Sequence, residues 1–183
     1  MIYGEPIRLR RDERTDLPKF VEWLNDPQVS RYLAAMRLPF SQANEEQWFE
    51  NMLKNPPEEQ PFAIEIRDGD SWRLIGNCGF SDINRTARSA EVGLLIGDKS
   101  CWNKGYGTEV MRLLLRTGFE TLNLNRIFLR VDEANKGGIR AYEKAGFVHE
   151  GRMRQAAYSE GRYSDYLFMS VLRSEWDARR GME

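Results

Sequence analysis

Cysteine and histidine are scarce in this chain of 183 residues, which contains two cysteines and one histidine. Cys78 and Cys101 form no C-x-x-C pair and no Cys/His cluster, so the sequence indicates neither a disulfide framework nor a zinc site. We therefore expect no metal, and a reducing cytoplasm fits this cysteine usage best. His149 lies outside every motif described below and is expected to be structural, which argues against Ser/His or Cys/His catalysis.

The chain also lacks an excess of charge of one sign, because 27 Lys and Arg residues stand against 28 Asp and Glu residues. Without a global basic field, binding to nucleic acid is not expected. An N-terminal apolar segment and apolar runs of membrane-spanning length are missing too, so we expect a soluble protein without a membrane partner. The length fits a single domain, residues 1–183, with a short frayed tail from about residue 175. The sequence is compatible with a monomer and with a homodimer.

Apolar spacing along the chain changes between the periods of helices and strands. Helical spacing occurs at 17–24, 43–54, 107–122 and 139–145, and strand-like runs at 7–10, 62–66, 72–80, 90–96, 126–131, 151–158 and 165–173. Antiparallel runs of strands with helices between specific pairs indicate an α+β fold with a mostly antiparallel sheet. The exception is the pair of strands joined by the helix at 107–122, which we expect to run parallel. Two strands connected by such a crossover can splay apart.

The most informative segment runs from Glu91 to Thr108, where an apolar strand leads into two glycines that open an amphipathic helix. Main-chain N–H groups at a helix N-terminus attract phosphate, and glycine allows the ligand to approach the backbone closely. Spacing excludes two phosphate motifs. Val110 stands where a dinucleotide fingerprint needs its third small residue, and no G-x-x-x-x-G-K-[ST] sequence occurs. By itself, the Gly105-Tyr106-Gly107 turn is more often a tight connection between strand and helix than a phosphate site.

A second segment, residues 135–147, decides between these alternatives. Its sequence is Asn-Lys-Gly-Gly-Ile-Arg-Ala-Tyr-Glu-Lys-Ala-Gly-Phe. Here the chain resembles the GCN5-related N-acetyltransferase (GNAT) superfamily, whose acetyl-CoA pyrophosphate loop, Q/R-x-x-G-x-G/A, matches at Trp102, Gly105 and Gly107. The later segment is similar to the superfamily's Asn-x-x-(x)-Ile-x-x-Tyr-Glu-Lys-x-Gly-Phe element, and the branch with ribosomal-protein N-terminal and spermidine acetyltransferases is the most similar. The resemblance implies a GNAT-like mixed sheet of about seven strands, flanked by about four helices, with a splayed pair of central strands.

The resemblance also implies acetyl-CoA as co-substrate and assigns residues to it. The backbone of the strand at 94–96 would pair with the pantetheine arm and supply an N–H group to the thioester oxygen. Asn135 would hydrogen-bond pantetheine or orient the amine. By their charge, Lys104 and Lys144 could meet the phosphates, although most lysines are simply solvated. Trp102 replaces the superfamily's Gln or Arg, but the backbone donors do not depend on that side chain. The expected cofactor-binding residues are Leu94, Leu95, Ile96, Asn103, Lys104, Gly105, Tyr106, Gly107, Thr108, Asn135 and Lys144.

Acetyl transfer to an amine needs proton removal, stabilisation of an oxyanion and protonation of the leaving thiolate. The resemblance places Tyr142 beside the sulfur as general acid. Since a tyrosine pKa near ~10 and a thiol pKa near ~8.5 make full proton donation uphill by roughly 2 kcal/mol, a hydrogen bond to the thiolate is the better description. Glu91, at the start of the strand that leads to the glycines, is the candidate base through a water chain; a charged strand end is the alternative.

The acceptor is the least specified part of the reaction. One helix carries Glu45, Glu46 and Glu50, which could attract a polyamine, although an acidic helix face is more often simply solvated. A polyamine, a protein N-terminus and another small amine all stay open. We therefore predict an N-acetyltransferase that moves an acetyl group directly from acetyl-CoA to a primary amine. The alternative is a non-catalytic acyl-CoA-binding or sensor module.

Overall fold

The computed structural model describes residues 1–33, 38–159 and 161–181, and the chain divides into two compact units. The first unit comprises Met1–Gly79 and Leu94–Tyr106, and the second comprises Phe80–Gly93 and Gly107–Glu183. Strands β4 (Ser71–Asn84) and β5 (Ser89–Ile96) contribute residues to both units. The boundary between the units therefore falls within the strand that leads to the glycine turn.

Antiparallel strands form the sheet of the first unit: β1 (Ile2–Tyr3), β2 (Ile7–Arg11), β3 (Phe62–Asp68) and the first part of β4. The sequence pattern identified all of them except β1, which has two residues and therefore no readable alternation. A β-bulge between Ile64 and Glu65 shifts the register of β3 against β4.

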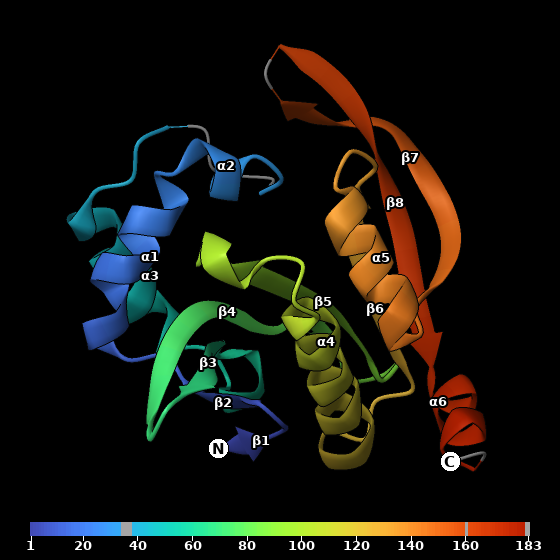
Figure 1. Ribbon diagram of the computed structural model, residues 1–183. Helices are drawn as coiled ribbons and strands as arrows, with labels where there is room; N and C mark the ends of the chain where they lie inside the picture. The colour runs from blue at the N-terminus through green and yellow to red at the C-terminus, as the bar shows by residue number, and fades with distance from the viewer. Residues whose placement is uncertain (34–37, 160, 182–183) are drawn as a thin grey trace. The chain divides into compact units, whose positions relative to one another are not determined.

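The helices of the first unit pack on this sheet through a small apolar core. They are η1 (Arg14–Asp16), α1 (Leu17–Leu24), α2 (Pro27–Ser30), α3 (Gln42–Met52) and η2 (Pro57–Glu59). Figure 1 shows α1 and α3 lying side by side. The core residues they bury are Leu17, Phe20, Trp23, Val29, Phe49 and Met52.

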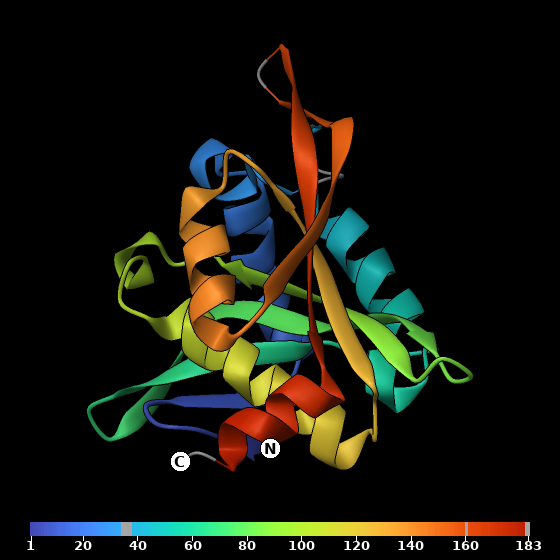
Figure 2. The ribbon, with the colours of Figure 1, turned by 90° about the vertical axis from the view of Figure 1, so that its right-hand side faces the viewer.

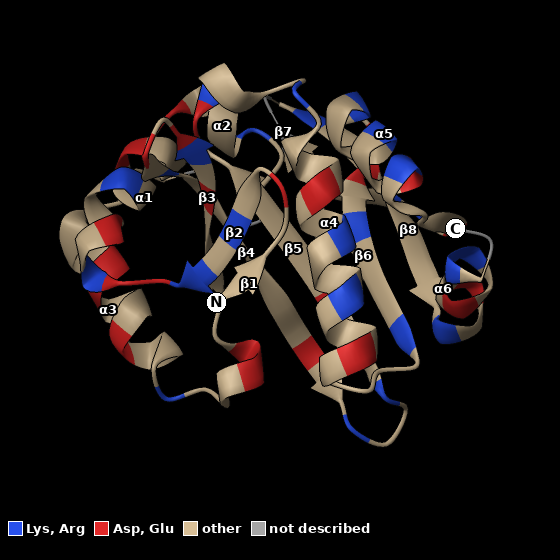
Figure 3. Ribbon diagram, turned by 60° about the horizontal axis from the view of Figure 1, so that its bottom comes forward, with Lys and Arg blue, Asp and Glu red and all other residues tan. Residues whose placement is uncertain are grey.

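Helix α3 corrects the expectation that its three glutamates form one solvated face. Glu45 is only 4% exposed and lies on the same side as Phe49 and Met52, because residues three and four apart share a helix face. Glu46 and Glu50 remain at the surface, where both bind Arg14. The acidic bands on α3 in Figure 3 therefore belong to two different environments.

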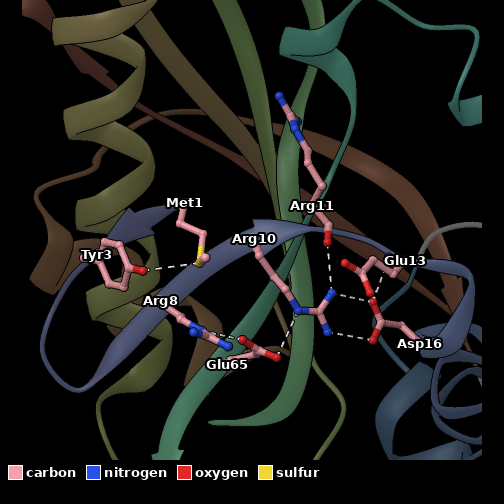
Figure 4. Close-up of polar contacts among 8 residues, drawn as sticks. All are labelled: Met1, Tyr3, Arg8, Arg10, Arg11, Glu13, Asp16 and Glu65. Atoms are coloured by element: carbon pink, nitrogen blue, oxygen red, sulfur yellow. Dashed lines mark hydrogen bonds and ion pairs between the residues drawn. The ribbon is translucent and has the colours of Figure 1, made fainter.

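A buried ion network joins β2 to the start of the helices (Figure 4). The Arg10 guanidinium donates two hydrogen bonds of 2.7 Å to the Asp16 carboxylate and one of 3.0 Å to Glu65. Glu65 also accepts a 2.6 Å bond from Arg8. Arg10 therefore neutralises Asp16 and part of Glu65, although both carboxylates are almost completely buried.

The second unit contains the parallel pair that the sequence predicts. Strand β6 (Arg126–Asp132) runs parallel to β5 and antiparallel to β8 (Arg162–Leu172), which pairs in turn with β7 (Val148–Ser159). Among the described residues, the β5–β6 ladder ends at Glu91 opposite Phe128, although both strands continue. The two strands are therefore joined only near their starts, as a splayed pair requires. In Figure 2 the β7–β8 hairpin extends well beyond α5.

Three α-helices accompany these strands: α4 (Tyr106–Arg116), α5 (Lys136–Ala145) and α6 (Arg173–Arg180). A π-helical turn, η4 (Thr117–Thr121), continues α4 nearly to the predicted end of that helix. Gly146 ends α5 at a φ of 107°, a left-handed conformation that favours glycine.

Helix α6 corrects the expectation of a frayed tail from about residue 175. The Trp176 ring packs on Phe119 at a centroid distance of 5.8 Å, and Arg179 donates a 2.8 Å hydrogen bond to the Gly146 carbonyl oxygen. Arg180 binds Glu120. These contacts lie far apart in sequence, so local composition does not reveal them; residues 182 and 183 lie outside the described part of the chain.

The predicted α+β class with mostly antiparallel strands is confirmed. The described residues form eight strands and six α-helices, against about seven and about four expected, because the sequence pattern misses β1 and α6 and does not register α2 as a full helix. Within these residues, none of the helices combines the length and apolarity needed to cross a membrane.

Replacing Gly76 with alanine should destabilise the first unit, because a Cβ atom at Gly76 would lie 2.0 Å from the Leu95 carbonyl oxygen. Backbone must then move, and such overpacking lowers the free energy of unfolding by about 3 kcal/mol. Denaturant unfolding measures this loss. Gly151→Ala is the matched control in a strand, since a Cβ there meets nothing within 4 Å. Equal stability of the two variants would contradict the close approach of β4 to Leu95.

Candidate active site

The glycine turn in the first unit is built around two left-handed residues. Asn103 has a φ of 58° and Gly105 a φ of 86°, and Asn103, Lys104 and Gly105 are all exposed. Turns that alternate between left- and right-handed residues direct successive N–H groups to one side, which suits an anion. The backbone geometry of this turn therefore agrees with the predicted phosphate cradle.

Trp102 has a role that the sequence comparison with Gln or Arg does not reveal. Its indole Nε1 donates a 2.8 Å hydrogen bond to the carbonyl oxygen of Ile96, the last residue of β5. Asp98 also stabilises the turn: its carboxylate accepts a 2.9 Å hydrogen bond from the Ser100 N–H and forms an ion pair with Arg73. The turn is thus held to the end of the predicted pantetheine strand, whose residues Leu94, Leu95 and Ile96 are half-buried.

Helix α4 begins at Tyr106, so Gly107 and Thr108 lie in its first turn, where N–H groups have no partner within the helix. The Thr108 hydroxyl donates a 3.3 Å hydrogen bond to the Ala141 carbonyl oxygen of α5. Arg112, one turn later, donates a 3.4 Å bond to the Lys144 carbonyl oxygen. In the second unit, α4 therefore lies beside α5 (Figure 1), with Thr108 in its first turn next to Ala141.

Tyr142 is the one aromatic residue of α5, and it is buried, with 9% of its surface exposed. Its ring meets Phe147 edge-on at a centroid distance of 6.1 Å. Burial raises the pKa of Tyr142 to about 12, so the hydroxyl stays protonated at neutral pH. Within the described residues that hydroxyl makes no hydrogen bond, which leaves its proton available to a ligand.

Asn135 occupies the N-cap of α5, where its Oδ1 accepts a 2.9 Å hydrogen bond from the Gly138 N–H. Its side-chain oxygen thus already accepts one hydrogen bond from the helix, and its amide nitrogen can donate to a ligand. Lys144 stands in the last turn of α5, about 13 Å along the helix from Asn135. The structure brings Thr108 close to Tyr142, but it separates Lys144 from Asn135.

Glu91 is engaged in a two-point ion pair. The Arg130 guanidinium donates hydrogen bonds of 2.7 and 2.8 Å to its two carboxylate oxygens. Each carboxylate oxygen thus already accepts one hydrogen bond from Arg130. The sequence did not predict the pairing, because Arg130 reaches Glu91 only through the parallel register of β5 and β6.

Other residues that could support different chemistry lie elsewhere. Cys78 and Cys101 are buried and unpaired, and burial raises the pKa of the Cys78 thiol, which makes it a poor nucleophile. His149 pairs with Glu143 at the surface, with 3.0 Å between Nε2 and Oε1. In the part of the chain that the structure describes, no group of three or more His, Cys, Asp or Glu residues could hold a metal ion.

The family model described as Acetyltransferase (GNAT) domain matches residues 7–148. The uncharacterized N-acetyltransferase p20 of Bacillus licheniformis is 32% identical over 96% of this chain and 97% of its own length. Spermidine N(1)-acetyltransferase of Vibrio cholerae serotype O1 is 30% identical over 93% of this chain and 95% of its own length.

Solved structures agree with the family model. The crystal structure of spermidine N-acetyltransferase from Vibrio cholerae in complex with CoA and spermine has a TM-score of 0.84 at 28% identity and covers 94% of this chain and 99% of that chain. The predicted superfamily, the reaction and acetyl-CoA as co-substrate are thereby confirmed. The chain belongs to the GNAT acetyltransferase family and is an acetyl-CoA-dependent N-acetyltransferase that acts on an amine.

Proposed function

We propose that the acceptor is a small amine of the polyamine class and that Tyr142 assists departure of the coenzyme A thiolate. The observation that carries the catalytic part is the buried Tyr142 hydroxyl, which has no hydrogen-bond partner among the described residues. Ala141, the residue before Tyr142, is bonded to Thr108 in the first turn of α4. The acceptor class is supported by the similar spermidine acetyltransferase and by the similar structure with CoA and spermine. A protein N-terminus and other small amines are the alternatives.

In the proposed reaction the ammonium group of the acceptor first gives one proton to a base, and the neutral nitrogen then attacks the thioester carbonyl carbon. The nitrogen releases a second proton to water as the neutral amide forms. An N–H group of the strand 94–96 stabilises the oxyanion that forms. The C–S bond then breaks, and the sulfur receives a hydrogen bond or proton from Tyr142. With a pKa of about 12 for Tyr142 and ~8.5 for a thiol, complete proton donation is uphill by roughly 5 kcal/mol, so hydrogen bonding dominates.

The donor is held, in this proposal, by backbone groups and lysines. The turn from Asn103 to Gly105 and the first turn of α4 receive the pyrophosphate, with Lys104 as the nearest cation in sequence. The Asn135 amide nitrogen serves the pantetheine arm, and Lys144 serves a phosphate at the far end of α5. The Thr108 contribution is its N–H group, because its hydroxyl is bonded to Ala141.

Glu91 is proposed as the base only in a state in which Arg130 releases it. A neutral glutamine in its place removes the base but keeps the side-chain shape. The pH dependence of kcat/KM then distinguishes the two roles. If the Glu91→Gln variant lacks the fall of kcat/KM at acidic pH, Glu91 is the base. If that fall is unchanged, Glu91 serves only as the ion-pair partner of Arg130.

We also propose that both units belong to one acetyltransferase domain, since the matched residues 7–148 run through both of them. A cytoplasmic location is supported by the two unpaired, buried cysteines.

A thiol-release screen tests the proposed function. Purified protein and acetyl-CoA are mixed with polyamines, monoamines, aminoglycosides, amino acids or N-terminal peptides, and free coenzyme A is measured. We expect release with polyamines at least about tenfold above the rate in the other classes. Preferred release with N-terminal peptides would replace the polyamine proposal, and mass spectrometry of the product identifies the acetylated nitrogen.

A further inference from the structure

Tyr142 takes part in the cap that closes α5. The N–H groups of Gly146 and Phe147 donate 3.0 Å hydrogen bonds to the carbonyl oxygens of Glu143 and Tyr142, respectively. With Gly146 in a left-handed conformation, these two bonds form a Schellman motif, in which the residue after the glycine commonly packs on the residue whose carbonyl it binds. Here the Phe147 ring meets the Tyr142 ring edge-on, at 6.1 Å between centroids. The cap therefore contacts Tyr142 through its backbone and through its ring.

A side chain of α6 binds this cap. Arg179 Nη1 donates a 2.8 Å hydrogen bond to the Gly146 carbonyl oxygen, and the described residues offer Arg179 no other hydrogen bond or ion pair. A Cβ atom at Gly146 would lie 1.6 Å from Nη1 and 2.9 Å from Cζ, so the guanidinium lies directly against the glycine. Gly146 thus has two functions: its φ suits the cap, and its missing side chain leaves room for Arg179.

Helix α6 can hold the cap because α6 is itself fixed to the end of α4 (Figure 2). The Trp176 ring packs on Phe119 of η4, at 5.8 Å between centroids. The Arg173 guanidinium donates hydrogen bonds to the carbonyl oxygens of Phe119 and Leu124, the latter of 3.3 Å. The end of α5 is thereby joined, through Arg179 and α6, to η4, the continuation of α4.

Tyr142 lies between two attachments of α5 to α4. Ala141, directly before it, accepts the hydrogen bond from Thr108 of α4. Gly146, four residues after it, is bound by Arg179. The Tyr142 hydroxyl makes no hydrogen bond among the described residues, so its position depends on how the helix that carries it is held. A displacement of about 1 Å at a reacting group lowers a rate by up to about 100-fold, so the attachment at Gly146 bears on turnover.

We propose that Arg179 is a positioning residue of the transfer reaction, which holds the α5 cap against α6 and thereby fixes the Tyr142 hydroxyl for the leaving sulfur. Arg179 contacts neither substrate in this proposal and supplies no proton. This inference rests on the proposed function, because it requires Tyr142 to act on the coenzyme A thiolate. It assigns a part in turnover to the C-terminal helix, which lies outside the residues 7–148 matched by the family model.

The test uses three variants of the full chain. Arg179→Met removes the donor and keeps a long apolar side chain, whereas Arg179→Lys keeps an N–H donor for the single bond to Gly146. Arg180→Met is the matched control, because Arg180 is the next residue of α6 but pairs with Glu120 instead of the cap. Thiol release from acetyl-CoA with spermidine, or with the fastest acceptor if spermidine is not acetylated, gives kcat and KM. Urea unfolding gives the stability of each variant.

We expect Arg179→Met to lower kcat by about three- to tenfold, while the KM for acetyl-CoA changes by less than about twofold and the urea midpoint stays as in the natural protein. Arg179→Lys should recover at least about half of the natural kcat, and Arg180→Met should keep it. In a Tyr142→Phe background, Arg179→Met should lower kcat no further, because the group that Arg179 positions is then missing.

The same fold loss in the Tyr142→Phe background would mean that Arg179 acts on folding or donor binding, and would overturn the inference. Natural kcat in Arg179→Met, or an equal loss in Arg180→Met, would overturn it too. The proposed function has different tests: natural kcat in Tyr142→Phe alone, or no thiol release with any amine, refutes it together with this inference, whatever the Arg179 variants do.

Discussion

Replacement of Tyr142 by phenylalanine is expected to lower kcat by about 100- to 10,000-fold, while the affinity for acetyl-CoA changes by no more than about twofold. The change removes one hydroxyl group that makes no hydrogen bond within the described residues. It leaves the ring, which packs on Phe147, in place. The loss should therefore appear in the chemical step and not in donor binding or folding.

Steady-state kinetics of thiol release and calorimetry with acetyl-CoA measure the two parts separately. Tyr163→Phe is the control for the same chemical change at a residue that is 67% exposed, and it should keep full turnover. A Tyr142→Phe enzyme with natural kcat would remove Tyr142 from the mechanism. A large loss of acetyl-CoA affinity would assign the hydroxyl to donor binding instead.

Replacement of Asp12 by asparagine should stabilise the ligand-free protein at alkaline pH. Burial, with repulsion from Asp16, raises the pKa of Asp12 to about 7, and Arg10 offsets only part of this. An unfolded chain has a value near ~3.9, so the folded state binds the proton more tightly. The free energy of unfolding of the natural protein should fall as pH rises from about 4 to about 7 and then level off.

The loss corresponds to a pKa difference of about 3, or at most about 4 kcal/mol at pH 8. The Asp12→Asn variant would lack this titration, so its stabilisation should be largest above pH 7 and disappear near pH 4. Urea unfolding at several pH values measures the curve, with Glu50→Gln on the exposed side of α3 as control. A gain that grows toward acidic pH would contradict the burial of an unpaired carboxylate at this position.

Much of the fold could be predicted from periodicity, because most strands and helices here alternate clearly between apolar and polar residues. The exceptions have physical causes. Strand β1 has too few residues to show a period, and α6 is polar on most of its surface and depends on Trp176 and Arg179 contacts with distant residues. Such elements are stabilised by tertiary contacts, which a local pattern does not contain.

The backbone features of the site could be predicted from the sequence, but the environments of its charged side chains could not. The glycine turn and α5 follow local rules of capping and backbone conformation, so Gly105, Asn135 and Gly146 were recognisable. The environments of charged side chains were not, because they depend on strand register and helix packing. Glu91 meets Arg130 through a parallel ladder, and Glu45 turns inward on a helix that reads as acidic.

The hydrogen bond between Thr108 and Ala141 bears on the kinetic order of the reaction. It connects the first turn of α4, where the donor's phosphates are proposed to lie, with the residue that precedes Tyr142. In the proposed mechanism, donor binding and the placement of the Tyr142 hydroxyl then depend on the same hydrogen bond. We therefore expect a sequential mechanism with acetyl-CoA as the leading substrate, since in the proposed mechanism the amine reacts only after the donor has fixed the helix that carries Tyr142.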